Sequence, residues 1–80
     1  MNIAIVRRAA DERPFRPFVL HLAGGRSLRV LSPECISVPP PPVEDEREGR
    51  LVIVYPLTGS SHVLDLFYVT DVEFPGATVT

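Results

Sequence analysis

The spacing of apolar residues changes from a helical period to an alternating one within the first twenty residues. Ile3, Val6 and Ala10 recur at helical spacing, and Asn2 stands where a capping side chain starts a helix. The β-branched residues of this segment leave a strand as the competing interpretation, but the arginines and alanines that follow are good helix formers. We therefore expect a short helix that ends before Pro14, because the residue before a proline avoids the helical region.

Alternation of apolar and polar side chains then indicates strands. Residues 18–22 place every second side chain on one apolar face, and residues 28–30 repeat the pattern. The glycine pair between them supplies the positive φ of a hairpin turn. A bend or single helical turn is expected at residues 32–35, followed by a short third strand at residues 36–38 that a proline ends.

The second half of the chain contains the longest apolar runs. Residues 51–55 are uninterrupted apolar sequence, which predicts a strand covered on one face by the core and on the other by the helix or a second subunit. A fifth strand is expected at residues 62–67, interrupted by Asp65. A tight turn is expected at residues 69–71, and a last short strand at residues 72–74.

One helix followed by five or six short strands with hairpin connections is typical of a mainly β fold. We expect a small, bent, antiparallel five- to six-stranded barrel of the SH3-like or Sm-like kind. The 80 residues allow one domain, because neither half is long enough for a core of its own. The domain divides into a helix, a first three-stranded part, a proline-rich and acidic exposed loop, the closing strands and a frayed tail, at residues 1–12, 13–38, 39–50, 51–76 and 77–80.

Composition limits how such a domain is stabilised. A chain of this size buries roughly 60–65% of the surface that its unfolded state exposes. Cys35 is the one cysteine, so no disulfide forms within the chain and stability must come from oligomerisation or an efficient core. No apolar run approaches the roughly 18 residues that span a bilayer, and a lone cysteine fits a reducing compartment. We therefore expect a cytoplasmic protein with no membrane partner.

Charge is unevenly distributed along the chain. Residues 1–30 carry six arginines against two acidic residues, a net charge of +4, whereas residues 31–80 carry two arginines against eight acidic residues, a net charge of −6. A basic half can contact an anion or attract the acidic half of a second copy. The other interpretation is a solvated surface whose charges intermix once the chain folds. The candidate anion contacts are the arginines of the basic half: Arg7, Arg8, Arg13, Arg16, Arg26 and Arg29.

Five short motifs follow one another in order along the chain. They are Arg-Pro-Phe-Arg-Pro-Phe, Gly-Gly-Arg, Ser-Pro-Glu, Val-Ile-Val-Tyr and Leu-Asp-Leu-Phe-Tyr-Val-Thr, at residues 13–18, 24–26, 32–34, 52–55 and 64–70. Together they resemble a group of short, uncharacterised bacterial proteins, over residues 1–74. This chain departs from that group by a serine before Pro33, where histidine is usual, and by a longer proline-rich loop. The resemblance implies no activity.

The expected architecture also resembles that of the Sm-like RNA chaperones of bacteria. Those proteins place a short helix before a bent five-stranded sheet and assemble into rings through their last strands. The hairpin at residues 20–25 is similar in character to their first turn, but their RNA-binding signatures have no counterpart at matching positions here. The resemblance therefore implies a fold and no residue roles.

No constellation in the sequence indicates catalysis. A nucleophile–base pair would require Cys35 or a serine beside His21 or His62, and no motif places them together. These residues and Asp65 also lack the spacing of a metal site. We expect no enzyme activity, no catalytic or metal-binding residues and no cofactor. His21 should face outward and Cys35 should be a small core residue, whereas Asp65, inside an apolar strand, would need an arginine or a backbone turn as its partner.

Two functional hypotheses remain. The first is an interaction module that binds protein partners, above all a second copy of itself, through its apolar strands. Its candidate interface consists of Leu51, Ile53, Tyr55, Leu64, Leu66 and Tyr68. The second is an Sm-like module in which the six arginines contact nucleic acid with a steep dependence on salt. We expect the first, because the net charge of −2 and the acidic loop count against the second.

Overall fold

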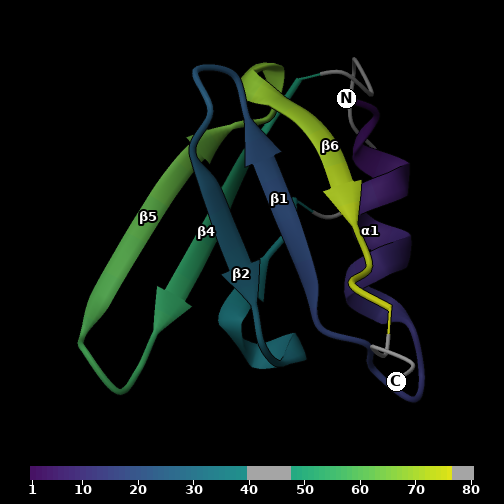
Figure 1. Ribbon diagram of the computed structural model, residues 1–80, viewed down its shortest axis with the longest axis vertical. Coiled ribbons are helices and arrows are strands. Elements are labelled where there is room, and N and C mark those ends of the chain that lie inside the picture. The colour runs from purple at the N-terminus through teal and green to yellow at the C-terminus, as the bar shows by residue number, and fades with distance from the viewer. Residues whose placement is uncertain (40–47, 77–80) are drawn as a thin grey trace.

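The computed structural model describes residues 1–39 and 48–76, and the expected mainly β chain with one leading helix is confirmed (Figure 1). The predicted exposed loop and frayed tail fall largely on residues 40–47 and 77–80, outside the described residues. In chain order the elements are α1 (Ile3–Asp11), β1 (Phe18–Leu22), β2 (Ser27–Val30), the 3₁₀ helix η1 (Pro33–Cys35), β3 (Ile36–Ser37), β4 (Arg50–Tyr55), β5 (Ser60–Asp65), the 3₁₀ helix η2 (Leu66–Tyr68) and β6 (Val69–Glu73).

Side chains satisfy free backbone groups at both ends of α1. The Oδ1 of Asn2 accepts a hydrogen bond from the N–H of Ala4 at 2.7 Å, which is the N-cap that the sequence predicts. At the C-terminal end the guanidinium of Arg13 donates to the carbonyls of Ala10 and Glu12 at 3.2 and 2.8 Å. A helix end leaves such carbonyls unpaired, so Arg13 replaces the missing donors.

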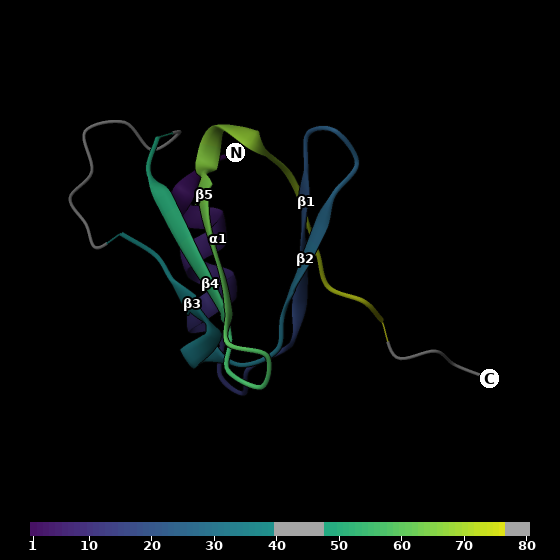
Figure 2. The ribbon, with the colours of Figure 1, turned by 90° about the vertical axis from the view of Figure 1, so that its left-hand side faces the viewer.

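The six strands form two antiparallel sheets of three strands each, in the orders β2-β1-β6 and β3-β4-β5. The chain passes from the first sheet to the second through η1 and returns through η2, so that the last strand pairs with the first. The sheets face each other, and η2 arches between them at one end (Figure 2). Pairing among the described residues does not close the strands into one barrel, because the η1 turn separates β2 from β3.

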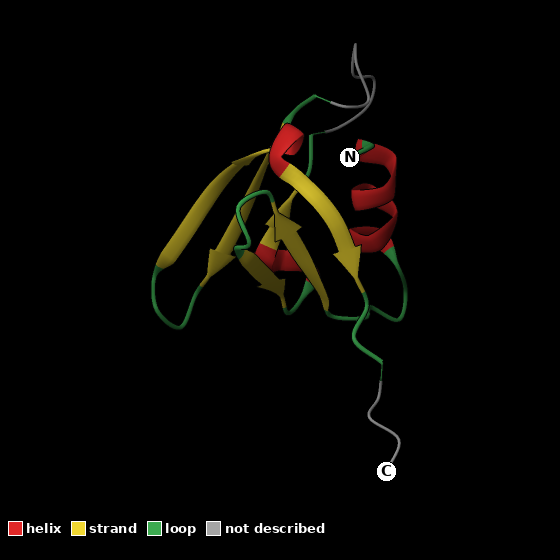
Figure 3. Cartoon of the chain, turned by 45° about the horizontal axis from the view of Figure 1, so that its top comes forward, coloured by secondary structure: helices red, strands yellow, loops and turns green. Residues whose placement is uncertain are grey.

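Side chains from α1 and from both sheets form one buried cluster. Phe18 lies within it, and its ring packs between those of Phe15 and Phe74, with centroids 5.9 and 5.8 Å away. α1 packs against the side of the sheets that lies away from β5 (Figure 3). The largest fully buried side chains are Ile3, Val6, Phe18, Leu20, Val30, Leu51, Ile53, Leu66 and Val69. One chain therefore completes a core of its own.

The turn after β5 differs from the sequence prediction. The strand ends at Asp65 rather than at residue 67, and residues 69–71, predicted as a turn, begin β6. Asp65 is the cause, because its exposed side chain accepts a hydrogen bond from the N–H of Phe67 at 2.9 Å and caps η2. The expectation of a buried carboxylate is therefore wrong, and of the partners considered for it the backbone turn is the one that it uses.

Two residues that flank the undescribed segment 40–47 are held against α1. The guanidinium of Arg7 donates to the carbonyl of Pro39 at 2.5 Å. Gly49 has a φ of +138°, and a Cβ at this position would lie 3.2 Å from the Cδ1 of Ile3. The positive φ therefore favours glycine at position 49, and a Cβ there would also make a tight contact with Ile3.

Candidate interaction surface

β5 is the outer strand of its sheet, and it is six residues long. It pairs with β4 on one side, in a register that places Leu64 opposite Leu51 and Val63 opposite Val52. Within the described part of the chain, no strand pairs with its other side. Figure 1 shows this free edge at the left margin of the molecule.

One backbone bond fixes which residues of β5 present their polar groups at the free edge. The N–H of Leu66 donates to the carbonyl of Gly49 at 2.8 Å, directly beyond the end of the β4–β5 ladder. In an antiparallel ladder, residues that bond to the neighbouring strand alternate with residues that do not. His62 and Leu64 therefore point their backbone groups toward β4, whereas Val63 and its second neighbours, Ser61 and Asp65, point theirs outward.

The outer face of the β4–β5 hairpin carries Val52, Val54 and Val63, next to the polar residues Arg50, Ser61 and Asp65. Its core face carries Leu51, Ile53 and Leu64, and the residues between them project to the other side. Val63 is 66% exposed there, and Val54 is also exposed. The sequence predicts that residues 51–55 are covered on both faces, but in the described part of the chain α1 packs elsewhere, and on the second face Val52 is half-buried and Val54 exposed.

Large apolar side chains also mark both ends of β5. Leu57 is fully exposed in the turn before the strand, and Phe67 and Tyr68 in η2 are 74% and 56% exposed. The rings of Phe67 and Tyr68 meet edge to face, with their centroids 5.4 Å apart. We define the β5 surface as the five exposed side chains of this region, out of seven large apolar ones that the described residues leave exposed: Val54, Leu57, Val63, Phe67 and Tyr68.

A groove of about 350 Å³ lies between β5, η2 and the β1–β2 hairpin. Its floor is apolar and includes Leu22, Val63 and Leu64, while Arg26 and Asp65 supply charged groups of opposite sign. The groove extends the β5 surface toward the core, because Leu22 and Leu64 belong to the buried cluster.

Of the interface residues that the sequence predicts, only one lies on this surface. Leu51, Ile53, Leu64 and Leu66 are buried in the core of the chain itself, and each is at most 9% exposed. Tyr55 is half-buried and donates its hydroxyl hydrogen to the carbonyl of Arg29 at 2.7 Å. Tyr68 is the one predicted interface residue that is exposed. An uninterrupted apolar run does not reveal which alternate residues face inward, so most of the predicted set consists of residues that form the core of one chain.

The structure divides the predicted anion contacts rather than gathering them. Arg7 and Arg13 bond to backbone carbonyls, as described above. Arg16 pairs with the carboxylate of Glu12, with an Nε–Oε1 distance of 2.6 Å, and its guanidinium lies 4.3 Å from the centre of the Phe74 ring. Three of the six arginines are thus committed to contacts within the fold.

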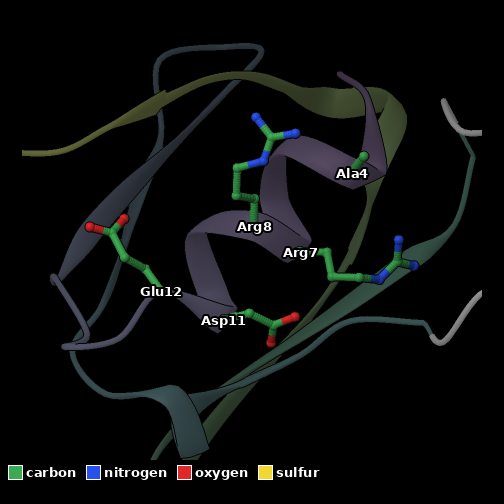
Figure 4. Close-up of a pocket in the computed structure, with 5 residues that line it drawn as sticks. All are labelled: Ala4, Arg7, Arg8, Asp11 and Glu12. Atoms are coloured by element: carbon green, nitrogen blue, oxygen red, sulfur yellow. The ribbon is translucent and has the colours of Figure 1, made fainter.

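The other three, Arg8, Arg26 and Arg29, lie on α1 and on the β1–β2 hairpin and are exposed. The outer face of α1 forms a shallow depression of about 550 Å³, with two arginines on one side and two acidic residues on the other (Figure 4). Its lining carries two positive and two negative side chains, so their formal charges sum to zero. Its lining residues are Ala4, Arg7, Arg8, Asp11 and Glu12.

The residues considered for catalysis have separate structural contacts. The Nε2 of His21 lies 2.7 Å from the Oε1 of Glu73, and the ring of His62 meets the edge of the Tyr55 ring. Cys35 is buried, as expected, and its Sγ lies 3.2 Å from the hydroxyl of Ser32. Among residues 1–39 and 48–76, no three His, Cys, Asp or Glu side chains gather where they could hold a metal ion.

Glu34, beside Cys35 in η1, has a perturbed acidity. A hydrogen bond from its own backbone N–H, then one from the Ser32 hydroxyl, holds the pKa of its carboxyl below the usual value of 4.5. The carboxyl is fully exposed, so this effect belongs to the local turn rather than to a reactive site.

Comparison with protein-family models, with curated proteins and with solved structures gives no match to this chain. The helices in the described part of the chain fall short of the length and apolarity that crossing a bilayer requires.

Proposed function

We propose that this protein is a non-enzymatic interaction module that associates with itself through the β5 surface. One observation carries the proposal: within the described residues β5 is an edge strand with one side unpaired, and exposed apolar side chains lie at its centre and at both ends. A free strand edge is a template for pairing with another chain, and proteins that remain monomeric blunt it with charges or proline. The centre of this edge carries Val63 instead.

Magnitudes support association in the micromolar range. Complete burial of one exposed valine, leucine or phenylalanine side chain is worth about 1.5–3 kcal/mol. The β5 surface supplies five large apolar side chains from each copy, whereas association costs about 4–15 kcal/mol in lost freedom. Partial burial of this area offsets that cost and leaves a net free energy of association near the roughly 8 kcal/mol of a micromolar complex.

The proposal extends to fold type and location. The path from β2 through η1 to β3, and from β5 through η2 back to the first sheet, is in keeping with an open relative of the bent SH3-like or Sm-like barrels. A bacterial, cytoplasmic protein is the setting that we propose, since Cys35 is a free thiol.

Light scattering tests the proposal, and the chain offers a matched pair of variants. Val63→Lys places a charge at the centre of the free edge, where the side chain is 66% exposed, and Ile5→Lys places one at an apolar position on α1 that is 50% exposed. We expect wild-type protein and Ile5→Lys to exceed the 8.8 kDa mass of one chain at micromolar concentration, and Val63→Lys to match it. A wild-type mass of one chain throughout would overturn the proposal.

Nucleic-acid contact is the second candidate function. It rests on Arg8, Arg26 and Arg29, whose guanidinium groups have no partner among the described residues. Such contacts weaken steeply as salt rises. The absence of a mobility shift with single- or double-stranded RNA or DNA at low salt would eliminate this candidate.

A further inference from the structure

The free edge of β5 is nearly self-complementary when two copies run antiparallel with Val63 opposite Val63. The outward-pointing backbone groups of each Val63 then face those of the other, in the geometry of a hydrogen-bonded pair. Ser61 of each copy lies opposite Asp65 of the other, which pairs a hydroxyl donor with a carboxylate acceptor. No like charges stand opposite each other in this register.

The same register aligns the exposed side chains at the ends of the strand. Leu57 precedes Val63 by six residues, and Tyr68 follows it by five. A symmetric antiparallel pairing therefore brings the Leu57 turn of one copy beside η2 of the other, where Phe67 and Tyr68 are exposed. It does so twice, once on each side of the two-fold axis, so apolar surface at both ends of β5 is covered.

Two other edge strands, β6 and β2, fit β5 less well. β6 is an edge strand with Asp71 and Glu73 on its exposed positions, so pairing it with β5 sets further carboxylates beside Asp65. In the symmetric pairing the two Asp65 side chains lie four strand positions apart, about 13 Å. At the edge of β2 the Tyr55 hydroxyl already donates a hydrogen bond to the carbonyl of Arg29, which is an acceptor that a pairing strand would need.

We infer that the partner of β5 is β5 of a second copy, paired antiparallel about a two-fold axis at Val63. This inference rests on the proposed function and specifies its geometry. Two such chains form one continuous six-stranded sheet, β3-β4-β5-β5-β4-β3. The pairing is closed, because each copy uses its β5 edge once, so the assembly stops at a dimer.

Cysteine cross-linking tests this geometry. Opposed Cα atoms in a hydrogen-bonded pair lie about 5.5 Å apart, within the reach of a disulfide. Under copper-phenanthroline oxidation we expect Val63→Cys to become a covalent dimer. Val54→Cys, exposed on β4, is the matched control, because its counterpart across the axis lies three strand spacings to the side, about 14 Å, and four residues along the strand, about 13 Å. Wild-type protein, with buried Cys35 alone, controls for the native thiol.

The outcomes separate this inference from the proposed function. A mixture of Val63→Cys and Asp71→Cys should yield the Val63→Cys homodimer and no mixed species. If the mixed species dominates, or if Val63→Cys fails to cross-link while light scattering still reports an oligomer, the symmetric pairing is wrong and self-association stands. If light scattering reports the mass of one chain, both the symmetric pairing and the self-association are wrong.

Discussion

The substitution Val63→Pro distinguishes the role of the free β5 edge in association from the role of β5 in the folding of one chain. Proline lacks an N–H, and the N–H of Val63 points away from β4, so the substitution removes no backbone bond within one chain. His62→Pro is the matched control one residue earlier, because the N–H of His62 points toward Ile53 of β4. The two variants make the same chemical change on opposite sides of one strand.

The expected magnitudes differ between folding and association. Val63→Pro should leave the free energy of unfolding of the isolated chain within about 1 kcal/mol of wild type, the usual effect of a surface substitution that strains nothing. His62→Pro should cost about 1–3 kcal/mol or more, because it leaves a carbonyl of β4 unpaired. In the dimer, Val63→Pro removes two symmetric hydrogen bonds of about 1 kcal/mol each, which weakens association roughly 30-fold.

Urea unfolding by circular dichroism at submicromolar concentration measures the first effect, and light scattering across a concentration series measures the second. If Val63→Pro unfolds as easily as His62→Pro, the assignment of outward-pointing groups on β5 is wrong. If Val63→Pro folds normally and associates as tightly as wild type, the β5 edge is not the interface.

Other substitutions test the fold that presents this surface. Gly49→Ala should lower the free energy of unfolding by about 1–3 kcal/mol in a urea titration, because a Cβ meets Ile3 and the backbone φ is positive; unchanged stability would contradict this. Asp65→Ala should cost about 0.5–2 kcal/mol by losing the cap of η2, and Asp65→Asn, which keeps an acceptor, should cost less. Phe18→Ala should cost about 3–5 kcal/mol and lower the melting temperature sharply, unlike a change at an exposed position. The lowered pKa of Glu34 means that its carboxylate stabilises the fold above the ordinary pKa of 4.5, and this contribution disappears as pH falls through the lowered value. Glu34→Gln should therefore show a flatter loss of stability on acidification below that pH, and an identical acid titration would refute the effect.

Local sequence signals were sufficient for the first half of the fold. The period of Ile3, Val6 and Ala10 and the capping Asn2 place α1 within a residue of its observed bounds. The alternation along β1 and the Gly24-Gly25 turn define the first hairpin, because both are properties of adjacent residues.

The rest of the fold depended on contacts between distant segments. The apolar run of β4 is equally compatible with either face turned inward, and pairing with β3 and β5 decides which one is buried. Asp65 occupies an apolar stretch that suggests a continuing strand, yet its side chain caps η2 and redirects the chain. Val54, Val63 and Phe67 of the β5 surface therefore alternate along the chain with the buried residues of the predicted interface, and Tyr68 belongs to both sets.

Amide hydrogen exchange at Val63 tests the central claim most directly. Among the described residues no strand lies beside the N–H of Val63, whereas the N–H of Leu64 points toward β4 within the same chain. We expect the Val63 amide to exchange rapidly in dilute protein and to become protected as concentration rises, with Leu64 protected throughout. An amide of Val63 that stays unprotected at concentrations where light scattering reports an oligomer would contradict the claim that β5 pairs with a second copy.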